Sequence, residues 1–276
     1  MSWQARLTLD YQNQQGRTAL RHVHDGPLRI LKSLYPEGDA VCHNVIVHPP
    51  GGLVGGDVLD IQIRVGAGAH GLISTPGATR FYASDEQPAT QRVDISLEPG
   101  ARLEWLPLEA IAYPGCQARN HWRARLGEEA ELMAWDVCAL GLPAAQQAFT
   151  SGHFHQRLEI PGLWLEQATL DAADAHLMNS PLGLAGHRCL GTMVFACGTP
   201  LTRERRELLQ EAARAALQEL PAHVHAGITS PNPNMVVVRA LAPVVEPLMA
   251  GMQRVWASLR TAAWNMGTAP PRIWRV

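Results

Sequence analysis

One short motif recurs four times in the first 200 residues: an alternating strand, a tight turn, and a second strand that runs into a polar corner. Its turns lie roughly 30 residues apart. Such a period is typical of solenoid-like β proteins, in which stacked units bury a shared face that one unit cannot bury alone. The four turns are Gly68-Ala69, Gly100-Ala101, Glu129-Ala130 and Gly162-Leu163.

Alignment of the four turns places two pairs of carboxylates in matching positions. Glu104 matches Glu166, and Glu109 matches Asp171. If the units stack in parallel, the matched carboxylates are expected to lie above one another. An ordinary antiparallel meander with its acidic residues in solvent is an equally consistent alternative at this stage.

The pattern of the chain changes after Cys197. Residues 1–197 consist of short alternating stretches rich in Val, Ile and Leu, separated by Gly and Pro, which predict strands. Thr199-Pro200 then predicts the start of a helix that Pro221 ends. The apolar stripe of that helix is Leu201, Leu208, Leu209, Ala212, Ala216 and Leu220.

A second helix is predicted from Val244 to Met266, after two strands at 223–229 and 235–241. Its less apolar face is only mildly polar, so the helix is either packed in the core or a docking surface. That face contains Gln253, Ala257, Arg260 and Thr261. The sequence therefore predicts a mainly β fold of stacked, solenoid-like or layered strands with two α-helices in the C-terminal third. We expect one domain over 1–276, with a β-rich body at 1–197 and a helix-containing part at 198–276.

Charge and cysteine content exclude several classes of protein. The 23 basic and 25 acidic residues give a net charge of −2, and no run of Lys or Arg predicts a nucleic-acid partner. The five cysteines include no C-x-x-C, which argues against a disulfide framework or a zinc knot and fits a reducing cytoplasm. No segment reaches the roughly 18 apolar residues of a membrane span, and the N-terminus lacks a signal-peptide pattern. We therefore expect a cytoplasmic protein that neither spans a membrane nor is exported.

Two glycine-rich segments resemble nucleotide-binding motifs. Residues 66–71 match G-x-G-x-x-G, but a strand follows them and meets Pro76, whereas a dinucleotide fingerprint requires a helix there. Residues 51–57 lack the Lys-Ser/Thr pair of a P-loop and end in Asp57. These segments therefore predict a β turn and a glycine corner that ends in a carboxylate.

The histidines of the chain support an alternative hypothesis, in which the protein is a metal-dependent enzyme. Three H-x-H pairs, His22/His24, His153/His155 and His223/His225, place both rings on one side of a strand. A metal-dependent hydrolase or cupin-like enzyme on a β scaffold is the second hypothesis, with Glu159 as the carboxylate that follows the His153/His155 pair. Cys42-His43 and His48 are further candidate ligands, while no Ser-His-Asp order or G-x-S-x-G motif is present.

Several longer strings resemble the UreD family of urease accessory proteins, also called UreH. The most specific is His48-Pro49-Pro50-Gly51-Gly52-Leu53-Val54-Gly55-Gly56-Asp57. Together they extend over nearly the whole chain in the family's order. The others are residues 26–38, 43–47, 75–82, 103–109, 163–166, 180–187 and 270–274.

The resemblance implies a mainly β protein with helices late in the chain that is not an enzyme. Members of the family bind apo-urease and UreF, which engages the GTPase UreG. Together these proteins help nickel and carbon dioxide reach the urease active site. The resemblance implies no permanently bound cofactor but nickel in transit through an internal polar conduit. Whether the chain forms a dimer within the accessory complex stays open.

The resemblance also suggests which residues nickel contacts on its way. Carboxylate oxygens and water can pass a divalent ion along, whereas thiolates and imidazoles would hold it. A structural adaptor whose carboxylates are incidental is the remaining alternative. In the segment 134–141 the family pattern leads us to expect a glutamate, and this chain has Asp136. The residues carried over are Asp57, Thr75, Glu104, Glu109, Asp136, Glu166 and Asp171.

Overall fold

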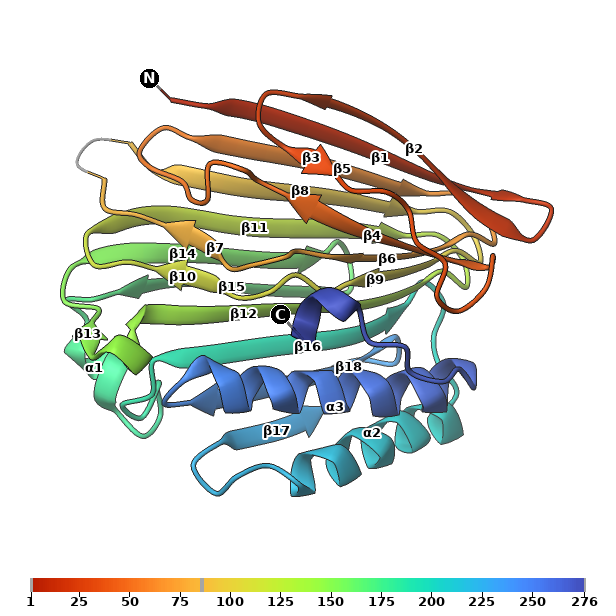
Figure 1. Ribbon diagram of the computed structural model, residues 1–276. Coiled ribbons are helices and arrows are strands. Elements are labelled where there is room, and N and C mark those ends of the chain that lie inside the picture. Colours follow the sequence, from red (N-terminus) through yellow and green to blue (C-terminus); the bar gives the residue numbers. More distant parts are fainter. Residues whose placement is uncertain (1, 85–86, 276) are drawn as a thin grey trace.

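The computed structural model describes residues 2–84 and 87–275 and contains two large stacked β-sheets (Figure 1). The first sheet has seven strands. In spatial order they are β15 (Trp164–Asp171), β14 (Gly152–Ile160), β11 (Cys116–Leu126), β8 (Ala89–Leu97), β5 (Val58–Val65), β1 (Gln4–Gln14) and β2 (Arg17–Asp25).

The second sheet lies over the first and has eleven strands. Its main path is β17 (His225–Thr229), β18 (Met235–Ala242), β16 (Cys189–Cys197), β12 (Glu131–Leu142), β9 (Arg102–Trp105), β6 (His70–Ser74), β4 (Val41–Val47) and β3 (Arg29–Ile30). Three short strands join β12 or each other at one side: β7 (Thr79–Phe81), β10 (Ala110–Ala112) and β13 (Gln147–Ala148). The predicted mainly β, solenoid-like architecture is confirmed.

The first three repeats form coils that cross from one sheet to the other. Strands β5, β8 and β11 pair in parallel in the first sheet, and β6, β9 and β12 pair in parallel in the second. Each crossing is a tight turn whose third residue has positive φ. This residue is Gly68 (+67°), Gly100 (+67°) and, in the third turn, Glu129 (+55°). The segment 66–71 is therefore the predicted β turn, closed by a bond of 3.0 Å from Ala69 N to Gly66 O.

The fourth repeat departs from the other three. After its turn the chain folds back, so that β15 pairs antiparallel with β14 at the edge of the first sheet. The expectation that Glu104 stacks on Glu166 is therefore wrong. Glu104 lies in the second sheet between Leu72 and Met133 of the adjacent strands. The same tight turn can lead either to the other sheet or back to an antiparallel neighbour in the same sheet. The turn sequence alone therefore does not decide which of the two connections forms.

Two long helices cover the second sheet at the end formed by strands β17, β18 and β16. Helix α2 (Arg203–Gln218) begins after Thr202, whose side chain caps Arg205 N, and not after Thr199 as predicted. Leu208, assigned to its apolar stripe, is 50% exposed, while Leu209 is buried. Helix α3 (Val245–Trp264) agrees with the prediction, except that Arg260 is buried and not on a polar face. A short helix, α1 (Ala175–Asn179), and the 3-10 turns η1 (Pro143–Ala145) and η2 (Arg272–Arg275) were not predicted.

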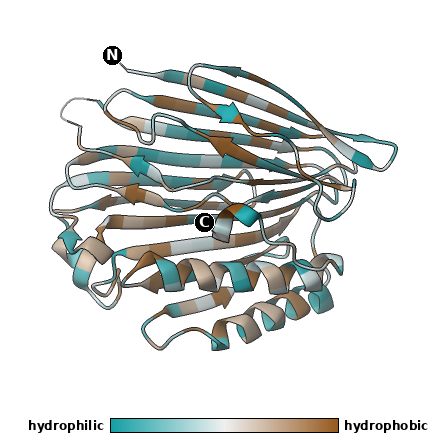
Figure 2. Ribbon diagram, viewed as in Figure 1, coloured by the Kyte–Doolittle hydropathy of each residue, from teal (hydrophilic) through white to brown (hydrophobic). Residues whose placement is uncertain are grey.

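Two apolar cores result from this layering. One fills the space between the sheets, and the other lies between the second sheet and helices α2 and α3. Strands of the first sheet alternate between apolar and polar residues (Figure 2), because their outer face is in solvent. In contrast, β12 is buried along almost its whole length, because both of its faces are covered. In the described part of the chain, no helix is both long and apolar enough to cross a membrane.

Candidate functional site

A row of amide side chains crosses the apolar core between the sheets. Gln91, Asn120 and Gln156 occupy neighbouring register positions on β8, β11 and β14 and point inward. Gln91 Nε2 donates to Asn120 Oδ1 over 3.0 Å. Such polar groups are costly in a core unless they are hydrogen-bonded, so the row requires polar partners from the facing sheet.

Asp136 of β12 provides that partner. Its two carboxylate oxygens accept hydrogen bonds from Asn120 Nδ2 at 2.8 Å and from Gln156 Nε2 at 2.6 Å. Burial, and to a smaller degree the negative charge of Glu166, raise the pKa of Asp136 to about 6, although the two hydrogen bonds favour the charged form. The carboxyl group therefore exchanges its proton near neutral pH, where a metal ion could displace it.

The polar contacts continue beyond Asp136 to the edge of the sheets. Thr192 is the register neighbour of Asp136 on β16, and its hydroxyl donates to Glu166 Oε1 over 2.7 Å. Arg239, next in the same row, donates from Nε to Glu166 Oε2 over 2.7 Å. We call the whole set the interior polar file: Gln91, Asn120, Gln156, Asp136, Thr192, Glu166 and Arg239.

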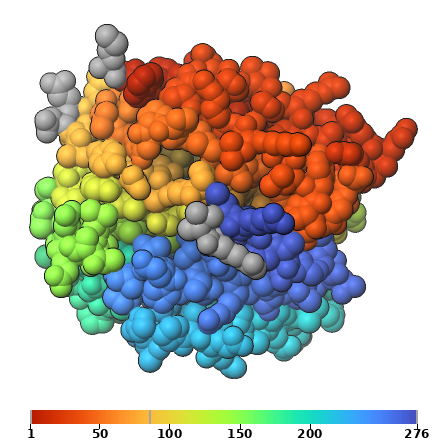
Figure 3. All heavy atoms as spheres, in the orientation of Figure 1, coloured from red at the N-terminus to blue at the C-terminus, as the bar shows by residue number. Residues whose placement is uncertain are grey.

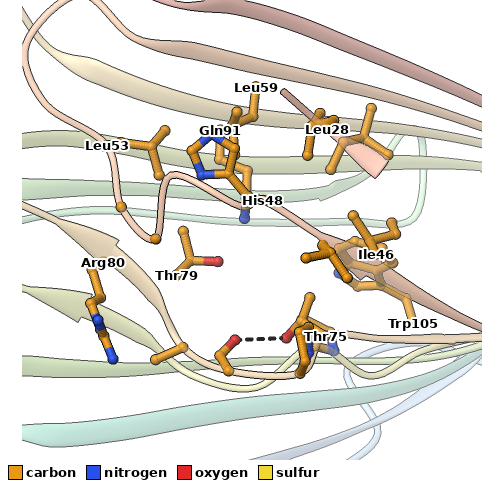
Figure 4. A pocket seen from close by; sticks show the side chains of 18 residues that line it. Leu28, Ile46, His48, Leu53, Leu59, Thr75, Thr79, Arg80, Gln91 and Trp105 are labelled. Carbon is orange, nitrogen blue, oxygen red and sulfur yellow. Dashed lines mark hydrogen bonds between the residues drawn. The ribbon is translucent and has the colours of Figure 1, made fainter. Parts of the chain in front are cut away.

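The other end of the file meets an open cavity of about 230 Å³. Figure 4 shows His48, Thr75, Thr79 and Gln91 around this space, with Trp105 at one side. Thr79, Gln91 and Trp105 also line a narrow second cavity of about 10 Å³, which reaches Asn120 and Asp136. The two cavities therefore lie next to each other, and the second is lined by the buried carboxyl group.

His48 lines the open cavity, which we call the entrance, with one free ring nitrogen. Its Nε2 atom is buried and has no hydrogen-bond partner among the described residues. Burial lowers the pKa of His48, and the charge of Asp57 only partly opposes this effect. The lowered pKa favours the neutral form of His48, in which an imidazole nitrogen can accept a proton or bind a metal.

The predicted residue Thr75 lines the entrance, whereas Asp57 does not, and the side chains of both form hydrogen bonds that hold the surrounding loops. Asp57 accepts from Trp3 N at 2.7 Å and from Val54 N at 3.0 Å, which fixes the glycine corner. The Thr75 hydroxyl accepts from Leu108 N at 2.9 Å and donates to Gly77 O at 3.0 Å, while its side chain lines the open cavity.

Glu104 lies on the opposite face of the second sheet, under helix α3. Its carboxylate contacts His70 Nε2 at 2.8 Å, Trp256 Nε1 at 2.5 Å and Arg260 Nε at 3.2 Å. Burial opposes its ionisation, but the hydrogen bond with His70 and the charge of Arg260 outweigh burial, so the pKa of Glu104 is lowered. The structure thus places Glu104 outside the interior polar file, with its oxygens already bonded.

The last two predicted residues are also separate from the file. Glu109 is half-buried, and its pKa is raised by burial and by the nearby charge of Glu246. Asp171 is exposed, and its Oδ1 accepts from Ala173 N over 2.8 Å in the turn after β15. Of the seven predicted residues, the structure brings together Asp136 and Glu166 in the file and Thr75 at the entrance to it.

The amides of the file were missed, although the sequence contains a signal for them. Inward positions of the strands β8, β11 and β14 are otherwise apolar or small, as in Val93, Trp122 and Leu158. One polar residue interrupts this alternation at the same place in three successive repeats. A comparison of the repeats along the strands, and not only at the turns, identifies Gln91, Asn120 and Gln156.

The H-x-H pairs lie apart from the file. His22 and His24 stack on exposed strand β2, with ring centroids 6.4 Å apart, and His225 lies 5.0 Å from His187. Within residues 2–84 and 87–275, no group of three or more His, Cys, Asp or Glu side chains is placed to hold a metal ion. The Cys42 thiol donates to Asn44 Oδ1, and His43 Nε2 lies 2.6 Å from Glu37 Oε1.

Comparison with known proteins identifies the family. The model of the UreD urease accessory protein family matches residues 4–275. Proteins named urease accessory protein UreD from Albidiferax ferrireducens and a Polaromonas species are 58% and 57% identical, each over 99% of both chains. The protein of the same name from Methylibium petroleiphilum is 46% identical over 100% of both chains. The chain therefore belongs to the UreD family of urease accessory proteins.

Proposed function

We propose that this chain is a non-catalytic scaffold of urease maturation that passes nickel along its interior polar file. Family membership supports the role in urease maturation. Its proposed partners are apo-urease and UreF, with UreG bound through UreF, in the cytoplasm. The proposed cargo is a nickel ion in transit, with no resident cofactor.

The burial and the bonding partners of Asp136 are the main support for this proposal. Asp136 is 6% exposed and makes no ion pair within the described residues, and its donors are two neutral amides. A buried carboxylate without a cation is costly, which is why the pKa of Asp136 is raised to about 6. A divalent cation at this position would compensate the charge and displace the proton.

The donors along the file suit passage better than storage. Amide carbonyls, hydroxyls and carboxylates are hard oxygen ligands, whereas nickel binds imidazole and thiolate more tightly. These oxygens are spread over four strands of the first sheet and two of the second. An ion would therefore meet successive weak sites and no closed set of ligands.

The narrow cavity beside Asp136 limits what can move along the proposed route. The narrow cavity of about 10 Å³ has roughly the volume that one water molecule needs. An ion with a complete hydration shell does not fit, so side chains such as Gln91 or Trp105 must move or the ion must lose water. We propose that this movement accompanies assembly with the partner proteins.

The test compares Asp136→Asn with wild type in urease activation, with nickel per urease active site as the readout at equal yield of complex. We expect nickel occupancy to fall severalfold, because the amide cannot take up the ionic charge. Asp39→Asn, at an exposed ion pair with Arg17, is the matched control and should leave occupancy unchanged. Unchanged occupancy in Asp136→Asn would reject the route but not the scaffold role. Absence of complex with wild-type protein would reject the scaffold role itself.

A further inference from the structure

The outer face of the first sheet carries cationic side chains at adjacent register positions. Arg119 of β11 lies beside His155 of β14. Two residues further along β11, His121 lies between Arg92 of β8 and Arg157 of β14. Their outward direction follows from strand alternation, because the residues between them are buried. We call this set the basic block: Arg92, Arg119, His121, His155 and Arg157.

The charge of the block is only partly neutralised. Arg157 is bonded to Glu159 at 2.9 Å, and that carboxylate also lies 3.8 Å from Arg123. Arg92 and Arg119 are exposed, and neither forms an ion pair with any described residue, although Asp60 is the register neighbour of Arg92. The block therefore presents two free guanidinium groups next to two imidazoles in a protein whose net charge is −2.

The imidazoles experience this positive environment. Burial and then the positive charges of His155, Arg119, Arg92 and Arg157 lower the pKa of His121 to about 4. The pKa of His155 is lowered by burial and by its cationic neighbours as well. The two rings meet edge to face with centroids 5.2 Å apart, and His121 Nε2 has no hydrogen-bond partner among the described residues. The nearest carboxylates on this face are Asp60, in the same row as Arg92 and His121, and Asp94, Glu159 and Asp171, in the rows at either end of the block.

An open hollow of about 380 Å³ lies over part of the block. It is lined by Arg119, His121, His153, His155 and Thr169. The Thr169 hydroxyl is 2.9 Å from His155 Nδ1, so it fixes that ring at the edge of the hollow. Guanidinium, imidazole and hydroxyl groups thus converge on a space that is accessible from solvent.

Three imidazoles in one hollow could suggest a cation site, but the charges oppose it. A divalent cation there would be repelled by Arg92, Arg119 and Arg157, and the described residues offer no three-ligand group. Nucleic acid is also a poor fit. The block covers three strands, about 10 Å, and two residues along them, about 7 Å, which is too short for a phosphate track.

We propose that the basic block is a docking surface for a short carboxylate-rich segment of a partner protein. The argument is charge complementarity, since the two free arginines can each form a bidentate pair with a carboxylate. The size of the block matches about three residues of extended chain. The adjacent imidazoles gain protons when carboxylates arrive, because an opposite charge favours the charged form. The proposal is independent of the nickel route.

The test uses a capped oligo-glutamate peptide of about four residues, measured by titration calorimetry at low salt, where surface charges are least screened. We expect Arg92→Gln/Arg119→Gln to weaken binding about tenfold or more relative to wild type. The matched control is Arg21→Gln/Arg64→Gln, two exposed arginines that flank Asp10 on the same sheet. It removes the same charge and should change affinity less than about twofold. Equal weakening in both variants would overturn the proposal, because it would indicate a non-specific charge effect.

Proton uptake provides a second, independent readout. Binding enthalpies near pH 6 are compared in two buffers with different ionisation enthalpies, for wild type and for His121→Gln/His155→Gln. We expect proton uptake with wild type and its loss in the double histidine variant. Tighter binding of an oligo-uridine of equal charge than of the peptide would overturn the assignment in favour of nucleic acid. No detectable peptide binding by wild type would overturn it as well.

Discussion

Arg260 of helix α3 donates from Nε to Oε1 of Glu104 over 3.2 Å, and both side chains are completely buried although 156 residues separate them. The pair belongs to a longer ionic chain. Arg260 also binds both oxygens of Glu37, at 2.5 and 2.8 Å, and Glu37 contacts His43. These contacts join helix α3 to strand β9 and to the segment 37–43 in the N-terminal half. The space-filling view shows the C-terminal segment, in blue, lying across the middle of the face (Figure 3).

Glu104→Gln is expected to destabilise the fold. It leaves the positive charge of Arg260 buried with only part of its compensation, and removal of one partner from a buried pair costs about 3–5 kcal/mol. Urea unfolding should show a lower midpoint with an unchanged slope. Glu211→Gln, at an exposed position of α2, should change the free energy of unfolding by less than about 0.5 kcal/mol. Equal stability of the two variants would contradict a structural role for Glu104.

Trp256 is expected to contribute both packing and a hydrogen bond. Its ring packs against Trp274, with centroids 5.2 Å apart, and its Nε1 donates to Glu104. Trp256→Ala should lower the free energy of unfolding by about 3–5 kcal/mol. Trp256→Phe, which keeps most of the apolar surface, should cost about 1–3 kcal/mol. If both variants remain as stable as wild type but lose binding to the proposed partner UreF, the helix is instead an interface.

The pKa of Asp136 predicts a specific dependence of stability on pH. Because the pKa is raised to about 6 in the folded protein, the folded state binds the proton more tightly than the unfolded state. This contribution to stability is complete below about pH 4 and is lost as the pH rises through about 6. The free energy of unfolding of Asp136→Asn relative to wild type should therefore increase by about 2–3 kcal/mol between pH 4 and pH 7. A difference that does not vary with pH would show that Asp136 titrates normally.

The amide row is expected to set the pKa of Asp136. Gln156→Leu removes a donor at 2.6 Å that stabilises the charged carboxylate, so the pKa of Asp136 should rise above its value in wild type. The measurement is a carboxyl-carbon NMR titration. Gln167→Leu, on the outer face of β15 where Gln167 accepts a bond from Arg157, is the control and should leave that titration unchanged. A lower or unchanged pKa in Gln156→Leu would show that the hydrogen bond does not stabilise the charge.

Local patterns predicted much of the fold. The strand-turn-strand repeat was readable because alternation has a period of two and because Gly68 and Gly100 mark positions of positive φ. The same turn was recognisable at Glu129, which adopts φ +55° without a glycine. Helix α3 was also placed within two residues of its bounds. These features depend on neighbours in the sequence, so the sequence contains their causes.

The candidate site was only partly predictable. Asp136 and Glu166 were identified through the family resemblance, and their grouping with Asn120, Gln156 and Thr192 appears only when the two sheets face each other. Glu104 could not be separated from them by pattern, because both faces of the second sheet are buried. Alternation then distinguishes two faces but does not say which one meets a helix and which one meets the other sheet.

The sequence by itself determined the repeating β architecture, the positions of its turns and the family. Only the tertiary structure decided that the fourth repeat folds back, that Arg260 is buried against Glu104, and that an amide row crosses the core to Asp136. The physical reason is the separation along the chain over which each kind of interaction acts. Turn and strand preferences act over a few residues, whereas the pairing of buried charges depends on which distant segments the closed core brings within hydrogen-bond distance.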